Sequence, residues 1–278
     1  MINTKKIISY LLGLVLSILL ISIILIGCIS SSIFSKAYIK KVFQKTDYYY
    51  GMYTIIQDDM KSDIMPSGFD EKVLDNVVTE NKVREDINSV LDSLYDNKKV
   101  EINTEEIRKV LDENVQAQIE EKNFRVTEEN KKGIEEVENS IIDIYKDNIS
   151  YSSETVNQFG KHIKKTSKML TIVMWILVII SIVLAVVLFK LNMPVLGISI
   201  TVAGLFFVIL NLYSGTAIVV NNILMFNWAF SKSLTYLVSK LIERMYIIGV
   251  TMTVIGLVEI VICEYFRAKE FVKYNRRG

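Results

Sequence analysis

The sequence predicts an all-α fold: a four-span helical membrane protein with an extracytoplasmic helical bundle domain inserted between the first and second spans. Residues 169–189 contain no charge, and a helix needs about 20 apolar residues to cross a hydrocarbon core of about 30 Å. Residues 79–149 instead repeat apolar side chains at helical spacing between charged ones, which is typical of helices in water. The fold class rests on this contrast and on the division of charge.

Charge is divided unevenly along the 278 residues. Residues 30–168 carry 21 Lys and Arg against 27 Asp and Glu, whereas the rest carries 11 and 4, within a net charge of +1. The chain is 51% hydrophobic with a mean hydropathy of +0.33, above what a soluble protein usually shows. We therefore expect an acidic water-exposed domain at 30–168 and a basic membrane module. Residues 30–168 hold no basic face interleaved with aromatic side chains, which argues against a nucleic-acid partner.

Residues 1–29 are predicted to form an N-terminal transmembrane anchor. A basic start, MINTKK, precedes an uncharged run over 7–29 and favours a cytoplasmic N-terminus. This run is longer than the apolar core of a signal peptide, which has about 7–15 residues, so a retained anchor is expected. The alternative is a lipoprotein, because residues 25–28 (LIGC) resemble a bacterial lipobox whose cysteine, Cys28, would carry the lipid.

Residues 30–62 are expected to continue the first helix outward, and no proline interrupts 30–65. Tyr49, Tyr50 and Tyr53 are candidates for recognition of a partner by the outer domain, and packing against neighbouring helices is the alternative. Pro66 and Gly68 predict a turn. That turn is either a functional loop or a corner between helices.

Three helices follow, each with an apolar stripe and a charged opposite face. Thr79 and Thr127 are expected to cap the first and third, and Asn103 with Glu106 forms a capping-box pattern for the second. A further helical pattern begins at Ser153 and enters 169–189 without a flexible linker. We therefore expect a stiff connection between the outer domain and the membrane.

The C-terminal part, 169–278, is predicted to hold three spans, about 169–189, 195–213 and 245–263, and a basic tail. A turn at 189–194 separates the first two. Residues 214–244 form a polar-apolar segment. Its first part, 214–230, is interrupted by Asn221, Asn222 and Asn227 and is expected to re-enter, to lie at the interface or to pack within a bundle, and a helix is expected from about Ser231. Four spans and the basic tail place both termini in the cytoplasm and 30–168 outside.

Polar residues within the spans are candidate functional groups, because they are costly in lipid. Glu259 and Lys190 are expected at a similar depth and in contact, and Asn211 can hydrogen-bond to another helix. The glycines stand seven apart in their spans and favour close helix packing: Gly197, Gly204, Gly249 and Gly256.

Known catalytic, phosphate-binding, dinucleotide-binding and zinc motifs do not appear. The lone histidine, His162, cannot form a multi-histidine metal site, so we expect no metal and no cofactor. The sequence favours a non-enzymatic membrane protein whose outer domain binds a partner or ligand, as a subunit of a complex in a bacterial cell envelope. Its partners would be membrane lipid and another membrane protein or a second copy. Alternatives are an oligomeric transport or channel component that uses the intramembrane polar residues, or an envelope enzyme.

Overall fold

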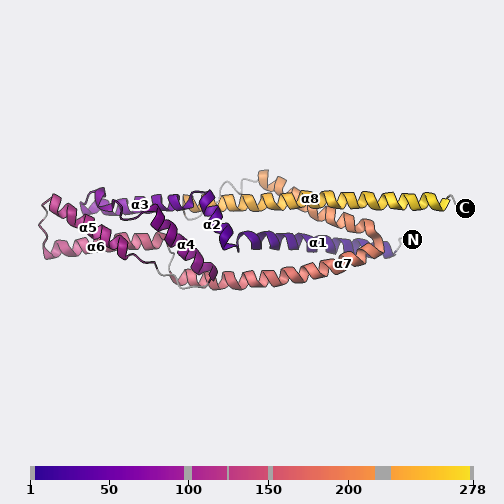
Figure 1. Cartoon of the computed structure of the whole chain (residues 1–278), viewed down its shortest axis with the longest axis horizontal. Coiled ribbons are helices and arrows are strands. Elements are labelled where there is room, and N and C mark those ends of the chain that lie inside the picture. Colours follow the sequence, from indigo (N-terminus) through magenta and orange to yellow (C-terminus); the bar gives the residue numbers. More distant parts are fainter. Residues whose placement is uncertain (1–3, 97–101, 124, 150–152, 217–226, 276–278) are drawn as a thin grey trace. The chain divides into compact units, whose positions relative to one another are not determined.

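All regular structure in the described part of the chain is helical, with no strand, which confirms the predicted all-α class. The computed structural model describes residues 4–96, 102–123, 125–149, 153–216 and 227–275. Figure 1 labels the elements: α1 (Thr4–Ser32), α2 (Lys36–Lys45), α3 (Tyr48–Ile64), the 3-10 turns η1 (Met65–Ser67) and η2 (Glu71–Leu74), α4 (Glu80–Asp96), α5 (Glu105–Glu121), α6 (Glu128–Ile149), α7 (Ser153–Thr216) and α8 (Trp228–Asn275).

The chain forms two compact units. The membrane module comprises residues from 1–35, 167–223 and 234–278, and the helical bundle comprises residues from 36–166 and 224–233. The bundle thus includes the first described turn of α8, a segment for which the sequence predicted a re-entrant, interfacial or bundle-packed arrangement. Asn221 and Asn222, invoked for the same prediction, lie outside the described residues.

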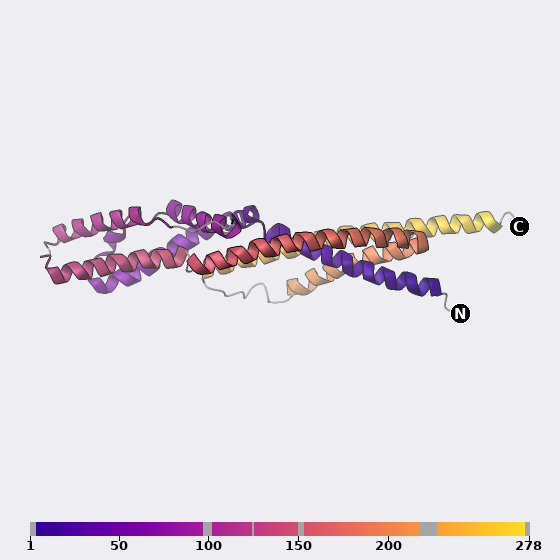
Figure 2. The same cartoon turned by 90° about the horizontal axis from the view of Figure 1, so that it is seen from below.

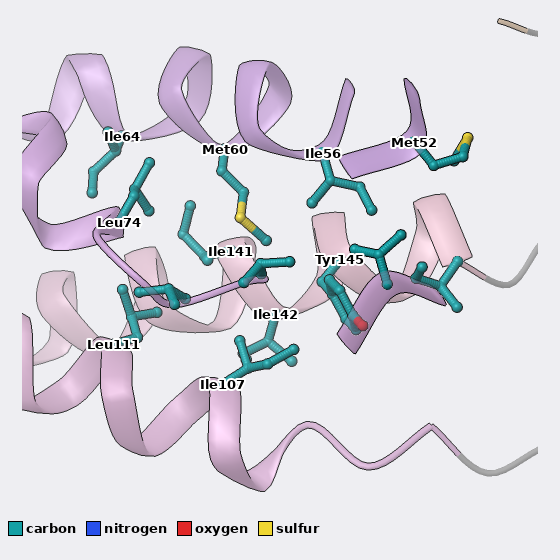
Figure 3. Packing of buried hydrophobic residues seen from close by; sticks show 14 of the residues in the cluster. Met52, Ile56, Met60, Ile64, Leu74, Ile107, Leu111, Ile141, Ile142 and Tyr145 are labelled. Atoms are coloured by element: carbon teal, nitrogen blue, oxygen red, sulfur yellow. The ribbon is translucent and has the colours of Figure 1, made fainter. Parts of the chain in front are cut away.

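Helix α3 lines the bundle core along its length. Its side chains Ile56, Met60 and Ile64 point toward α5 and α6, as Figure 3 shows, and these three and Met52 are buried. The apolar stripes expected on α4, α5 and α6 face the same core, which also takes in two short segments between α3 and α4 that the sequence left unassigned. Those added residues are buried: Val73, Leu74, Val77 and Val78.

Side-chain oxygens begin the bundle helices much as predicted. Thr79 Oγ1 accepts from the Lys82 N–H at 3.2 Å and Thr127 Oγ1 from the Asn130 N–H at 3.3 Å, so both caps are confirmed. The capping box at Asn103 is wrong in position, because α5 starts one residue later, after Thr104. Asn103 Oδ1 instead accepts from the Glu105 N–H at 2.9 Å, an Asx turn just ahead of the helix.

The helix expected to run straight from the first span to residue 62 is interrupted twice. Helix α1 ends at Ser32 in a run of serines, and Ser31 Oγ donates to the Cys28 carbonyl at 3.2 Å. Such local bonds compete with the helical pattern. The second break is at Asp47, whose φ of 55° is left-handed and ends the helical path between α2 and α3.

Helix α7 begins at Ser153 and continues through 169–189, which confirms the helical connection predicted there. It contains two candidate spans, Gly160–Leu191 and Met193–Ser214. The chain reverses direction between them in both views of the molecule (Figures 1 and 2), at the turn predicted near Pro194. Helix α8 starts at Trp228 and runs to Asn275 as one helix.

Four helical segments in the described residues are long and apolar enough to cross a membrane, as predicted. Two lie in α7; the others are Thr4–Ser32 and Trp228–Lys269. Their large side chains mostly face away from the protein, as lipid-facing residues do. The chain is therefore compatible with a multi-pass membrane protein.

Glycines bring the second limb of α7 (193–216) against α8. A Cβ on Gly204 would lie 2.6 Å from the Gly249 carbonyl oxygen, and one on Gly197 would lie 2.9 Å from that of Gly256. The two pairs make the helices antiparallel and leave no room for a side chain at the crossing. The predicted close packing at these glycines is confirmed.

Small residues also join α1 to this limb of α7. Ser17 Oγ lies 3.0 Å from the Ser199 carbonyl oxygen, and a Cβ on Gly13 would lie 2.8 Å from Ser199 Oγ. Leu16 is buried on the same face against Leu188 and Val195. The module therefore packs α1, α7 and α8 through small residues and a few interlocking apolar ones.

Candidate functional site

The bundle contains a pocket of about 470 Å³ at the end where α3 leads into η1 and α5 leads into α6. This volume lies in the range of small-ligand sites, roughly 300–1,000 Å³. Its wall is assembled from three separate segments: 67–69, the C-terminal turn of α5, and 125–137. Gly68, a candidate from the sequence, lines it.

The 67–69 segment is held by local hydrogen bonds. Ser67 Oγ donates to the Ile64 carbonyl at 2.6 Å and accepts from the Phe69 N–H at 3.3 Å. Gly68 adopts a φ of 80°, which a residue with a side chain would adopt only with strain. Pro66 stands in the first turn of η1, where its fixed φ suits a helical start. The turn is therefore built, and Phe69 is placed on the pocket wall.

Two contacts attach this turn to α5. The Asp70 N–H donates to Oε1 of the buried Gln118 at 3.0 Å, and the Asp70 carboxylate pairs with Lys122 at 3.0 Å. Ile119, one residue from Gln118, is buried and faces the pocket. These contacts fix the distance between the turn and the end of α5.

The opposite wall comes from the start of α6. Asn130 Nδ2 donates to the Arg125 carbonyl at 3.2 Å, which holds the approach segment against the first helical turn. Gly133, Ile134 and Val137 follow on one face of α6 and line the pocket. A Cβ on Gly133 would meet nothing within 4 Å, so the pocket extends over this glycine.

The lining is mainly apolar, with one cationic group. Arg125 is exposed, and no ion pair with another described residue involves it. The Ser67 hydroxyl and the Asn130 amide add polar groups, and none of the described residues that line the pocket is acidic. Such a site suits a ligand with an apolar body and an acidic group, because a guanidinium binds carboxylate, sulfonate or phosphate oxygens in a fork.

The tyrosine candidates lie at the other end of α3. Tyr49 is buried, donates to Asn88 Oδ1 at 3.0 Å and lies beneath the Arg84 guanidinium at 5.2 Å. Burial raises the pKa of its hydroxyl. Tyr50 is exposed and Tyr53 half-buried, 6.4 Å apart between ring centres. The tyrosines and the 66–68 turn therefore do not form one site, since even Tyr53 lies about 16 Å along α3 from the end of that helix at Ile64.

The intramembrane candidates are not brought together by hydrogen bonds or ion pairs. Glu259 is half-buried on α8 and Lys190 is exposed on α7, and the ion pairs between described residues do not join them. The Gly197–Gly256 contact does place Glu259 level with the turn that follows Lys190, which agrees with the expected depth. Asn211 is half-buried, and its carbonyl accepts from Ser214 Oγ of the same helix at 3.0 Å.

The remaining sequence candidates have separate surroundings. Cys28 is buried with Phe207 and Met245, and both it and Cys263 are free thiols. His162 is exposed. Across the described ranges no group of three or more His, Cys, Asp or Glu could hold a metal ion.

Residues missed by the sequence analysis complete the pocket. No sequence motif includes Arg125, Val126 or Gly133. Gly133 lies among the many charged residues of α6, so its position gave no signal of a pocket. The available signal was an exposed apolar side chain, Val126, beside a basic one in a short connection. No protein-family model, curated protein or solved structure matches the chain.

Proposed function

We propose that this protein is a non-enzymatic multi-pass membrane protein of the cell envelope whose extracytoplasmic bundle binds a ligand in the Ser67–Val137 pocket. The observation that carries the proposal is the pocket itself, a mainly apolar hollow with the Arg125 guanidinium in its wall. A hydrogen bond joins the Asp70 N–H to Gln118 of α5, and another holds Arg125 to Asn130 at the start of α6. The ligand is a compact apolar molecule or group that carries a carboxylate or another acidic group.

The arrangement supports binding more than catalysis. Among its described lining residues are one hydroxyl, one amide and one guanidinium, and the hydrogen bonds between described residues pair none of them with an acidic or imidazole side chain. Ser67 Oγ is already engaged with backbone groups on both sides. The polar groups are thus suited to orienting a bound molecule.

The proposed orientation places the bundle outside and both termini in the cytoplasm. This orientation is supported by the four candidate spans of the described residues, since an even number of crossings would return both ends of the chain to one side of the membrane. Lys5 and Lys6 before the first span and the basic residues after the last favour the cytoplasmic side for both. The outward-facing apolar surface of the module would contact lipid and the other subunits of a complex.

Photolabelling of the full chain in nanodiscs tests the ligand proposal. The probe is 4-benzoylbenzoate, an apolar photoreactive body with a carboxylate, and 4-benzoylbenzamide is its uncharged control. We expect labelled peptides from 67–69 or 125–137 with the carboxylate, and weak labelling with the amide. Labelling confined to other segments, or equal labelling by both probes, would overturn the proposal.

A glycine series makes this test specific to the cavity. Gly133→Leu should abolish the labelling because the new side chain enters open space in the pocket, whereas Gly133→Ala adds one carbon and should retain it. Arg125→Gln should weaken labelling by about tenfold, the value of one charge-assisted hydrogen bond. Lys131→Gln, a matched loss of an exposed cation that does not line the pocket, should leave it unchanged.

Orientation is tested on intact cells that express the chain. In a background with Cys28→Ser and Cys263→Ser, a single Lys131→Cys should react with a membrane-impermeant maleimide without permeabilisation. A cysteine in place of Arg267 should react only after permeabilisation. The reverse pattern would place the bundle in the cytoplasm and refute the proposed orientation.

A further inference from the structure

A second cavity lies in the membrane module, between α1 and α8, with a volume of about 360 Å³. Its α1 wall is formed by Ile24, Gly27 and Ser31, which share one helix face, and its α8 wall by Ile247 and Ile248. A Cβ on Gly27 would meet nothing within 4 Å. The glycine thus leaves a gap on a helix whose neighbouring residues are large.

Arg244 places a positive charge at one end of this cavity. It is the last charged residue before the uncharged run 245–258 of α8, and Ser31 and Ser32 are in the last turn of α1. Arg244 Nη1 donates to Ser32 Oγ at 3.3 Å, a contact that sets the guanidinium at the ends of both spans. The charged end of the cavity therefore coincides with the expected boundary between hydrocarbon and headgroups.

The chemistry changes along the cavity from cationic to apolar. A guanidinium and the Ser31 hydroxyl lie at the boundary, and Ile24, Gly27 and Ile248 lie deeper along the spans. A phosphodiester would bind at the first part in the fork geometry of arginine, and a hydrocarbon chain at the second. Basic pockets between transmembrane helices are known sites for anionic lipid headgroups.

We propose that this cavity is a binding site for an anionic phospholipid. Its phosphate contacts Arg244 and Ser31, and one acyl chain lies over Gly27 between the two helices. The site is separate from the bundle pocket and does not depend on the function proposed for it. Charge complementarity at the boundary and an apolar groove within the span identify the occupant as a lipid, since a soluble anion would leave the groove unfilled.

Native mass spectrometry of the full chain, released from nanodiscs, tests the site. The nanodiscs contain phosphatidylglycerol and phosphatidylcholine of matched acyl chains. The protein should retain phosphatidylglycerol in preference. Arg244→Gln should lower that retention about tenfold, as loss of a charge-assisted hydrogen bond predicts, while Arg267→Gln, a matched cation outside the cavity, should leave it unchanged.

Two further arms separate the groove from the charge. Gly27→Leu should lower retention as strongly as Arg244→Gln while the thermal unfolding of the protein stays unchanged, because its side chain enters open space. Glycerol 1-phosphate, the headgroup chemistry without acyl chains, should not displace the lipid at equal concentration. Equal retention of both lipids, retention unaffected by Arg244→Gln or Gly27→Leu, or displacement by glycerol 1-phosphate would overturn the proposal.

Discussion

The bundle and the membrane module are both helical, yet they bury opposite kinds of residue. In the bundle, Ile56, Met60 and Leu111 are wholly buried between α3, α5 and α6. In the module, Ile179 and Val183 of α7 are 60% and 59% exposed, and the closest helix contacts are made by glycines.

The difference follows from what surrounds each unit. Water drives large apolar side chains of the bundle inward, because their burial removes apolar surface from water. Lipid gives no such drive, so helices in the module associate where small residues let backbones pack closely. The same apolar stripe therefore indicates a core face in 79–149 and a lipid face in 169–189.

Truncation of a large apolar side chain should give the largest difference in stability loss between the bundle and the module. Leu111→Ala should lower the stability of the bundle by about 2–5 kcal/mol, since it leaves a cavity at a fully buried site. Ile179→Ala, matched in size and facing lipid, should change stability little. Thermal unfolding of the full chain, with hydrogen exchange of α5 and α6 as a local readout, measures both. Similar losses in the two variants would contradict the assignment of the α7 surface.

Adding a methyl group should destabilise the module where two glycines are in close contact and should have little effect where a glycine faces open space. Gly204→Ala places a methyl group 2.6 Å from the Gly249 carbonyl oxygen and should destabilise the module by about 1–3 kcal/mol. Gly27→Ala, on α1 of the same module, meets open space and should be neutral. Thermal unfolding in nanodiscs compares them, and a neutral Gly204→Ala would refute the close crossing.

Substitution of Glu138 should raise stability, unlike the substitutions above, because the bundle buries this carboxyl. It is 8% exposed, its Oε1 has no hydrogen-bond partner among the described residues, and burial, followed by the charge of Asp112, raises its pKa. A raised folded pKa means that the folded state favours the protonated acid, so stability falls as pH rises through the ordinary carboxyl range toward the raised pKa.

Glu138→Gln should therefore stabilise the bundle at neutral pH by roughly 1 kcal/mol, within the range for a buried unsatisfied group. The benefit should disappear in acid, below the ordinary carboxyl pKa, where Glu138 is protonated in both states. Unfolding measured across pH tests this, with exposed Glu135→Gln as the control. Equal stabilisation at all pH values would exclude titration of Glu138 as its cause.

The surface ion pairs of the bundle should give the smallest effect. Lys40 Nζ lies 2.7 Å from Asp92 Oδ1, and this contact, followed by that of Lys36, lowers the Asp92 pKa. Lys40→Gln should cost less than about 1 kcal/mol, because both side chains are partly exposed. The contribution should be present at neutral pH, fade as pH falls through the lowered Asp92 pKa and shrink in salt. A loss that salt does not change would point to packing of the lysine stem.

Regular features of the fold were predictable from sequence because their signals are local. The stripe at Ile107, Leu111 and Val115 fixes which face of α5 is buried, and hydroxyl residues at Thr79 and Thr127 mark helix starts. Glycine spacing in 197–204 and 249–256 predicted close helix packing at these residues, and the structure shows that the two segments pack against each other.

The breaks and the pocket were not predictable, because they depend on contacts between distant segments. Asp47 sits beside Thr46, whose Oγ1 lies 2.7 Å from Ser233 Oγ, and the first turn of α8 packs Ala229 against Gly51. The sequence of residues 30–65 does not indicate that residues 228–233 of the same chain pack against it. Gly68 was found from turn chemistry, but its neighbours Arg125 and Gly133 are joined to it only by folding.

The matched glycine spacing has a consequence for how the span pair is assembled. If α8 slid along α7 by seven residues, about 10 Å, only one glycine would still face a glycine. Any smaller slip would set side chains against both glycines. Both glycine pairs therefore form in only one alignment of the two helices. The two equal intervals thus fix a register in which Glu259 lies level with the turn at Pro194.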